Sequence, residues 1–215
     1  GCSDAAPEKS GGAQAGAKAD AGISADAPLI IRFGDSLYAG YQLGPKEGLA
    51  PVLQAALKDA GIAARVQNAG VSGDTTAAGL QRLGFVLDNA PKKPDLFLVG
   101  LGGNDMLRGI GPEQTRQNLT AILDELAKRD IAVVLTGMKV SANMGEAYAA
   151  EFEAIYPALA KRDGVTLYPF ILDGVITDPQ LMLDDHLHPN AKGVAKMVEA
   201  LVPVVAKALP PKTAP

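Results

Sequence analysis

The chain has 215 residues, a length that suits one globular domain with an ordinary hydrophobic core. Hydrophobic residues make up 47% of the sequence and charged residues 20%, proportions that are typical of soluble enzymes. The formal net charge of -4 gives no case for nucleic-acid binding, and no apolar run is long enough to span a bilayer.

The composition of the first 27 residues predicts a flexible tether that lies outside the folded domain. Residues 3–27 consist mainly of Ala, Gly, Ser, Asp and Lys, which cannot bury enough apolar surface to offset the entropy of ordering the chain. Cys2 is the single cysteine, so an intramolecular disulfide is excluded. Gly1-Cys2-Ser3 resembles the end of a bacterial lipoprotein signal, in which the Cys is lipidated. The alternative is a free thiol on a disordered tail.

We therefore expect residues 1–27 to be a disordered tether with a lipidation site at Cys2. This predicts a location in the bacterial periplasm or cell envelope, with a membrane tether through Cys2. Residues 28–215 are expected to form a single folded domain, and no internal repeat or second domain is visible in them.

From residue 28 onward, short apolar runs alternate with stretches of helical periodicity. This alternation predicts an α/β fold: a three-layer α/β/α sandwich with a five-stranded parallel sheet and right-handed crossovers. The predicted strands cover residues 29–33, 64–67, 96–101, 131–135 and 165–168. The predicted helix faces cover residues 49–57, 80–87, 112–126, 148–159 and 194–201. We expect Pro203 to kink or end the last helix.

The first predicted strand ends in Gly34-Asp35-Ser36, a tight turn that leaves the Ser36 hydroxyl at the carboxyl end of the strand. Ligands bind at that edge of open α/β sheets. Ser36 is therefore well placed to act as a nucleophile, provided that a base and an oxyanion site lie nearby. The alternative is that these residues serve only the turn, through the freedom of Gly and the local hydrogen bonds of Asp and Ser.

A glycine follows the second predicted strand, in Ser72-Gly73-Asp74-Thr75. Because Gly73 lets the backbone approach a ligand closely, its N–H could stabilise an oxyanion. The alternative is that this segment caps a helix through Asp74 or Thr75. The two roles can coexist.

An asparagine follows the third predicted strand, in Gly102-Gly103-Asn104-Asp105. Its side-chain amide is a neutral, directional donor, as an oxyanion hole requires. The alternative is that Asn104 or Asp105 caps a helix that begins near Met106.

Both histidines lie close together near the C-terminus, in Asp184-Asp185-His186-Leu187-His188-Pro189. Asp185 and His188 are three residues apart, so one turn can bring the carboxylate to the imidazole and fix its tautomer. Pro189 favours an extended backbone at His188, consistent with a loop. The alternative is a metal site formed by His186 and His188 together with Asp184 or Asp185. A catalytic zinc usually has three protein ligands and the supply here is thin, so we expect no metal.

Taken together, the four motifs resemble the SGNH hydrolase superfamily, also called GDSL esterases/lipases. The resemblance extends from residue 29 to about residue 201 and follows the family's order: Gly34-Asp35-Ser36-Leu37, Gly73, Gly102-Gly103-Asn104-Asp105 and Asp185-His186-Leu187-His188-Pro189. The bacterial thioesterase I/lysophospholipase L1/arylesterase branch is the most similar, since Gly40-Tyr41, Leu107-Arg108-Gly109 and Ala154-Ile155-Tyr156-Pro157 also resemble it.

The resemblance implies a flavodoxin-like SGNH fold and a serine esterase that works through an acyl-enzyme without metal or organic cofactor. It implies that Ser36 is the nucleophile, that Asp185 and His188 complete the triad, and that the N–H groups of Ser36 and Gly73 and the Asn104 side chain form the oxyanion hole. His186 departs from the family, whose members often carry Gly there, and is given no role.

The expected substrates are small to medium acyl esters and thioesters, including aryl esters, acyl thioesters and lysophospholipids. We expect a monomer with no nucleic-acid partner. Two other functions stay open: a carbohydrate O-acetyl esterase on the same fold, and a non-catalytic binding module.

Overall fold

A computed structural model of the chain describes residues 22–211, and Cys2 with most of the predicted tether lies outside them. Five parallel strands form one sheet in the order β2-β1-β3-β4-β5. The strands are β1 (Leu29–Gly34), β2 (Arg65–Gly70), β3 (Leu96–Gly100), β4 (Ala132–Thr136) and β5 (Val165–Tyr168). This confirms the predicted parallel sheet, and the strand order is the flavodoxin-like one.

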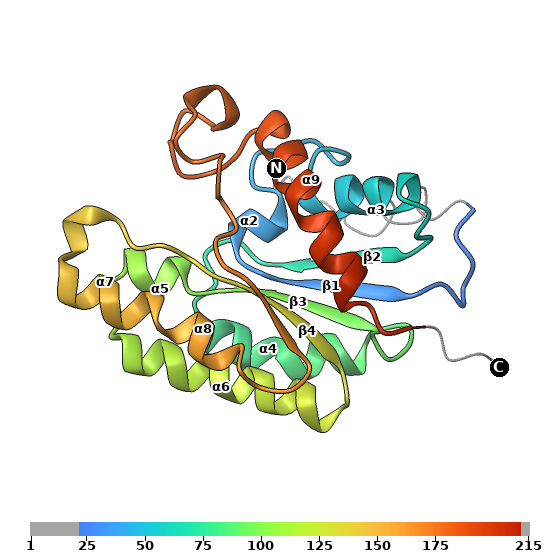
Figure 1. Ribbon diagram of the computed structural model, residues 1–215, viewed down its shortest axis with the longest axis horizontal. Coiled ribbons are helices and arrows are strands. Elements are labelled where there is room, and N and C mark those ends of the chain that lie inside the picture. Colours follow the sequence, from blue (N-terminus) through green and yellow to red (C-terminus); the bar gives the residue numbers. More distant parts are fainter. Residues whose placement is uncertain (1–21, 212–215) are drawn as a thin grey trace, which may run out of the picture.

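Helices cover both faces of the sheet, which confirms the three predicted layers (Figure 1). One face carries α2 (Ser36–Ala39), α3 (Leu49–Asp59) and α9 (Ala191–Ala208). The other carries α4 (Thr76–Asp88), α6 (Pro112–Lys128), α7 (Glu146–Glu153) and α8 (Ile155–Leu159). The short helix α5 (Gly103–Leu107) and two 3₁₀ turns, Ala142–Met144 and Pro179–Leu181, complete the described chain.

Two hydrophobic clusters, one on each face, explain why the central strands β1 and β3 are mostly apolar. The buried Arg32 of β1 is the charged exception. Along β1, Ile31 and Phe33 pack toward the α4 and α6 side, whereas Ile30 packs toward α3 and α9. All five residues of β3 are buried. A strand covered on both faces reads as a continuous apolar run and shows no alternation.

The strand β2 is longer than predicted and runs on to Gly70. Residues 68–70 pair with residues 32–34 of β1, although the strand was predicted to end at residue 67. Because β2 lies at the edge of the sheet, its side chains are only partly covered and polar residues such as Asn68 are tolerated.

Two helix predictions need correction at prolines. The single helix predicted over 148–159 is divided into α7 and α8, because Pro157 has no N–H to donate to the carbonyl of Glu153. In contrast, α9 continues through Pro203 to Ala208, so the helix does not end at that residue, which was one of the two outcomes predicted there. Pro203 is exposed, so water can reach the carbonyl that it leaves without a donor, while Val205 in the following turn is buried.

Among the described residues, no helix combines the length and the apolar character needed to cross a membrane.

Candidate active site

Ser36 is the first residue of α2, directly beyond the carboxyl end of β1, as the sequence predicted. The N-cap of α2 is Asp35, whose Oδ1 accepts a hydrogen bond from the Leu37 N–H at 3.1 Å. The chain leaves this four-residue helix through Gly40, which has a φ of 81°. The sharp turns on both sides present the Ser36 side chain at the edge of the sheet.

A hydrogen-bonded relay joins Ser36 to His188 and Asp185. Ser36 Oγ lies 2.7 Å from His188 Nε2, and His188 Nδ1 lies 2.5 Å from Asp185 Oδ2. The other carboxylate oxygen of Asp185 accepts from the N–H groups of Leu187 at 2.9 Å and His188 at 3.0 Å. This arrangement gives the imidazole an Nδ1–H directed at the carboxylate and a free lone pair on Nε2 toward Ser36.

Asp185 is held in its ionised form. Desolvation would raise its pKa, but the hydrogen bonds from His188 and Leu187 outweigh it and lower the pKa to about 2. The carboxylate is therefore negative at neutral pH and can stabilise a positive charge on His188.

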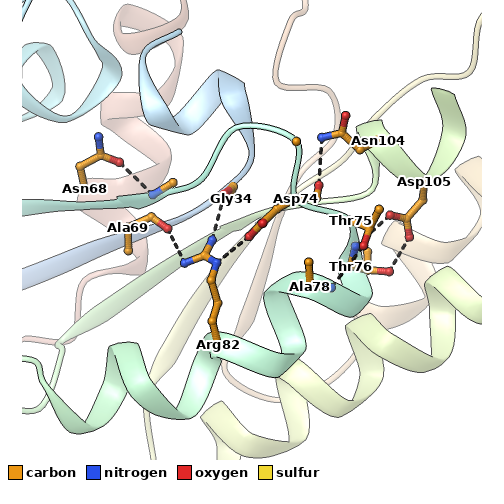
Figure 2. A network of polar contacts seen from close by, with 12 residues as sticks. Gly34, Asn68, Ala69, Asp74, Thr75, Thr76, Ala78, Arg82, Asn104 and Asp105 are labelled. Carbon is orange, nitrogen blue, oxygen red and sulfur yellow. Dashed lines mark hydrogen bonds and ion pairs between the residues drawn. The ribbon is translucent and has the colours of Figure 1, made fainter. Parts of the chain in front are cut away.

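Ser36, Gly73 and Asn104, which the sequence predicted as oxyanion donors, line the same cavity. Within the described residues, the N–H groups of Ser36 and Gly73 have no hydrogen-bond acceptor. Gly73 has a φ of 86°, a conformation that favours glycine. Asn104 Nδ2 donates to the Asp74 carbonyl at 2.9 Å (Figure 2), which orients the amide and leaves its second hydrogen available.

The structure decides between the alternative capping roles. Thr75 is the N-cap of α4, since its Oγ1 accepts from the Ala78 N–H at 3.2 Å, and this role coexists with an unengaged Gly73 N–H. The predicted cap by Asn104 or Asp105 is wrong, because α5 begins earlier, at Gly103, and both residues lie inside its first turn.

A cavity of about 1120 Å³ opens over these groups and is lined by Ser36, Gly73, Asn104 and His188. Several of its lining residues are large apolar side chains that are unusually exposed: Tyr41 (38%), Leu107 (59%), Ile176 (40%) and Leu187 (48%). The polar reacting groups therefore lie beside an apolar surface that is open to a ligand.

His186 also lines the cavity, but it is exposed and its backbone has a φ of 55°. This left-handed conformation favours glycine and is uncommon for other residues, although His is among those that adopt it. In the described part of the chain, no group of three or more His, Cys, Asp or Glu side chains is placed to hold a metal ion.

Two side chains at the site were not singled out from the sequence for a role. The ring of Tyr41 lies 4.5 Å from that of His188, between centroids, and forms part of the cavity wall. Arg82 projects from α4 toward the loop that carries Gly73 (Figure 2). Neither lies in a strand-end motif: Tyr41 comes five residues after Ser36, and Arg82 lies in the middle of a helix.

Comparison with known proteins gives consistent results. A model of the GDSL-like lipase/acylhydrolase family matches residues 33–196. An arylesterase from Vibrio mimicus is 38% identical over 180 residues, which cover 84% of this chain and 89% of that protein. Thioesterase 1/protease 1/lysophospholipase L1 from Escherichia coli K12 is 38% identical over 83% of this chain and 87% of its own. The crystal structure of AlinE4, an SGNH-hydrolase family esterase, superposes with a TM-score of 0.73 at 51% identity, covering 87% of this chain and 100% of AlinE4.

Proposed function

The chain belongs to the GDSL-like lipase/acylhydrolase family, and on that premise we propose that it is a serine esterase. It hydrolyses carboxylic ester or thioester bonds of small to medium acyl substrates through an acyl-enzyme. The observation that carries the proposal is the 2.7 Å contact between Ser36 Oγ and His188 Nε2 in a cavity wall that also holds unengaged N–H donors.

In the proposed first half-reaction, His188 Nε2 takes the proton of Ser36 Oγ as that oxygen attacks the substrate carbonyl carbon. The negative charge on the carbonyl oxygen is stabilised by the N–H groups of Ser36 and Gly73 and by the Asn104 amide. His188 then gives its proton to the departing alcohol or thiol, and the acyl group remains on Ser36. Asp185 stabilises the imidazolium throughout.

In the second half-reaction, His188 takes a proton from water, which attacks the acyl carbon. The same three donors hold the second oxyanion. Collapse of this intermediate releases the carboxylic acid and returns the proton to Ser36 Oγ. The residues named here supply a nucleophile, a base and an electrostatic site, so the cycle needs no metal or organic cofactor.

The exposed apolar side chains of the cavity support substrates with an acyl chain or aryl group. Leu107, Ile176 and Leu187 each present a large part of their surface to solvent next to the reacting groups. Contact with a substrate chain would remove this surface from water, at about 25 cal/mol per Å². This favours aryl esters, acyl thioesters and lysophospholipids over acetylated carbohydrates.

Turnover of p-nitrophenyl esters from C2 to C16 tests this proposal. We expect hydrolysis that extends well beyond the acetyl ester for the wild type, and almost none for Ser36→Ala. Ser72→Ala changes another serine that lines the cavity and should keep substantial activity. Turnover restricted to the acetyl ester would favour the O-acetyl esterase, and no turnover of any ester would favour the binding module.

Two further proposals, on oligomeric state and on location, rest on the sequence alone. One is that the protein acts as a monomer. The other is that a lipid on Cys2 anchors it in the bacterial periplasm or cell envelope, with the residues up to 27 as the spacer.

A further inference from the structure

Arg82 connects the ends of β1 and β2 to the loop that carries Gly73 through a single guanidinium group (Figure 2). Its Nη2 donates to the carbonyl of Gly34 at 3.1 Å, two residues before the nucleophile. Its Nη1 donates to the carbonyl of Ala69 at 2.8 Å, near the end of β2. Its Nε donates to Asp74 Oδ2 at 2.5 Å, one residue after the oxyanion glycine. The ends of β1 and β2 and the loop that carries Gly73 are therefore tied to one planar group.

The guanidinium has little freedom to move. It lies over the ring of Phe33, with its central carbon 4.1 Å from the ring centroid, and Phe33 is fully buried in β1. Only 20% of the Arg82 side chain and 10% of the Asp74 side chain are exposed. A charge-assisted hydrogen bond between partly buried groups is shorter and stronger than a neutral one, and stacking on an aromatic ring fixes the plane of the fork.

Asp74 is also fixed through its backbone. Its N–H donates to the carbonyl of Val71 at 3.2 Å, and its carbonyl accepts from Asn104 Nδ2 at 2.9 Å. The Arg82 contact to the Asp74 carboxylate therefore bears on two oxyanion donors at once: the N–H of neighbouring Gly73, and the amide of Asn104 that is oriented by the Asp74 carbonyl.

We propose that Arg82 is a positioning residue for the oxyanion hole, which sets the distance between Ser36 and the donors of Gly73 and Asn104 by joining Gly34, Ala69 and Asp74. This inference rests on the proposed function. Arg82 touches neither substrate nor reacting atoms. It acts through the loop that carries Gly73, and a displacement of about 1 Å in such a site can cost about 10²-fold in rate.

The first test is Arg82→Met, which keeps the length and apolar stem of the side chain and removes all three hydrogen bonds. We expect kcat for a p-nitrophenyl ester to fall by about 10- to 100-fold with KM little changed, because the oxyanion donors act mainly when charge develops. The pH profile of kcat/KM should keep its shape, since the Ser36–His188–Asp185 relay is untouched. Activity is measured well below the melting temperature of each variant.

Arg129→Met is the matched control. Arg129 also joins two elements, through Asp88 at 2.7 Å and Glu125 at 2.8 Å. It lies between α6 and β4, at the amino ends of the strands, whereas Ser36 lies at their carboxyl ends. Its kcat should equal that of the wild type. Arg82→Lys is the second variant: it keeps the charge beside Asp74 but cannot reproduce the planar fork, so its kcat should be intermediate. If Arg82→Met does not fold, Arg82→Lys decides the question.

A double-mutant cycle with Asn104→Ala separates positioning from a general structural effect. Asn104→Ala alone should lower kcat by about 10²–10³, as for a lost oxyanion donor. If Arg82 acts through the same site, the combined loss should be smaller than the product of the two single losses. Losses that multiply, or a folded Arg82 variant with the kcat of the wild type, would overturn the proposal. If the wild type and Arg129→Met both fail to hydrolyse esters, the proposed function itself is wrong.

Discussion

Asn104 and Asp105 are neighbours in the chain, yet their side chains serve different parts of the molecule. Successive residues of a helix project about 100° apart, so when Asn104 faces the cavity, Asp105 faces the interior. Asp105 is fully buried and accepts from the Thr76 N–H at 2.8 Å and from the Thr115 hydroxyl at 3.0 Å. It thereby holds the start of α4 against α6. The sequence presented these two residues as competing caps, but the structure assigns neither to that task.

Asp35 should make the free energy of unfolding depend on pH. Burial raises its pKa to about 6, against the opposing effects of the Leu37 N–H and of His188. The folded state thus holds this proton more tightly than the unfolded state, whose carboxyl titrates near the ordinary value of 3.8. The free energy of unfolding should therefore decrease as the pH rises from about 4 through 6.

Asp35→Asn removes the free-energy cost of ionising a buried carboxyl group and keeps an acceptor for the N-cap. Relative to the wild type, the variant should gain about 2–3 kcal/mol in the free energy of unfolding between pH 4 and pH 8. Urea unfolding of both proteins at the two pH values measures the difference. An equal effect of the substitution at both pH values would contradict the assignment.

The residues of the proposed triad and oxyanion hole could be named from the sequence because each follows a recognisable strand end or sits in a motif of fixed order. Arg82 could not be predicted in the same way. Its partners are backbone carbonyls of Gly34 and Ala69, which any sequence supplies, and their proximity depends on the pairing of β1 with β2. The orientation of Asn104 toward Asp74 likewise depends on where α5 begins.

At the scale of elements, α2 is fixed to the sheet by Tyr38, whose ring crosses the carboxyl ends of the strands. The Tyr38 hydroxyl bonds with Thr136 Oγ1 of β4 at 2.7 Å, and its carbonyl accepts from the buried Arg32 at 2.8 Å. The ring fits because Gly34 and Gly100 have no side chains: a Cβ on Gly100 would lie 2.0 Å from Tyr38 Cε2. The short helix that carries Ser36 is therefore held by a side chain two residues further on.

Gly100→Ala should consequently destabilise the protein, by about 1–3 kcal/mol or more, because the ring must leave its slot. Gly84→Ala is the matched control, since a Cβ on Gly84 in α4 meets nothing within 4 Å. It should stabilise the protein by about 0.5–1 kcal/mol, as expected for Gly replaced within a helix. Chemical denaturation of both variants checks the opposite signs. Equal effects would show that the space beside Gly34 and Gly100 does not constrain Tyr38.

The existence of the elements followed from periodicity, whereas their bounds depended on tertiary context. The extension of β2 to Gly70 comes from pairing with β1, which no local pattern signals. The same residue type acted differently in two helices: Pro157 separates α8 from α7, whereas exposed Pro203 lies within α9. The deciding factor at Pro203 is the burial of the following turn, which depends on the fold.

At the scale of the whole molecule, the strand order brings the motifs together. The chain passes from β1 to β2 on one side and then to β3 on the other, so the ends of β1 and β3 lie at the switch point of the sheet, where ligands bind in open α/β folds. Ser36 follows β1 and Asn104 follows β3. The segment that carries Asp185 and His188 then closes the site from beyond β5, shortly before α9.

Covalent labelling with a fluorophosphonate shows whether Ser36 is a nucleophile activated by this assembly. Intact-mass measurement followed by peptide mapping should show one phosphonyl group on Ser36 of the wild type. His188→Ala should be labelled far more slowly, because its serine has lost the base that accepts the proton. Rapid labelling at Ser72 or another residue, or no labelling of a protein that still hydrolyses esters, would show that Ser36 is not the nucleophile.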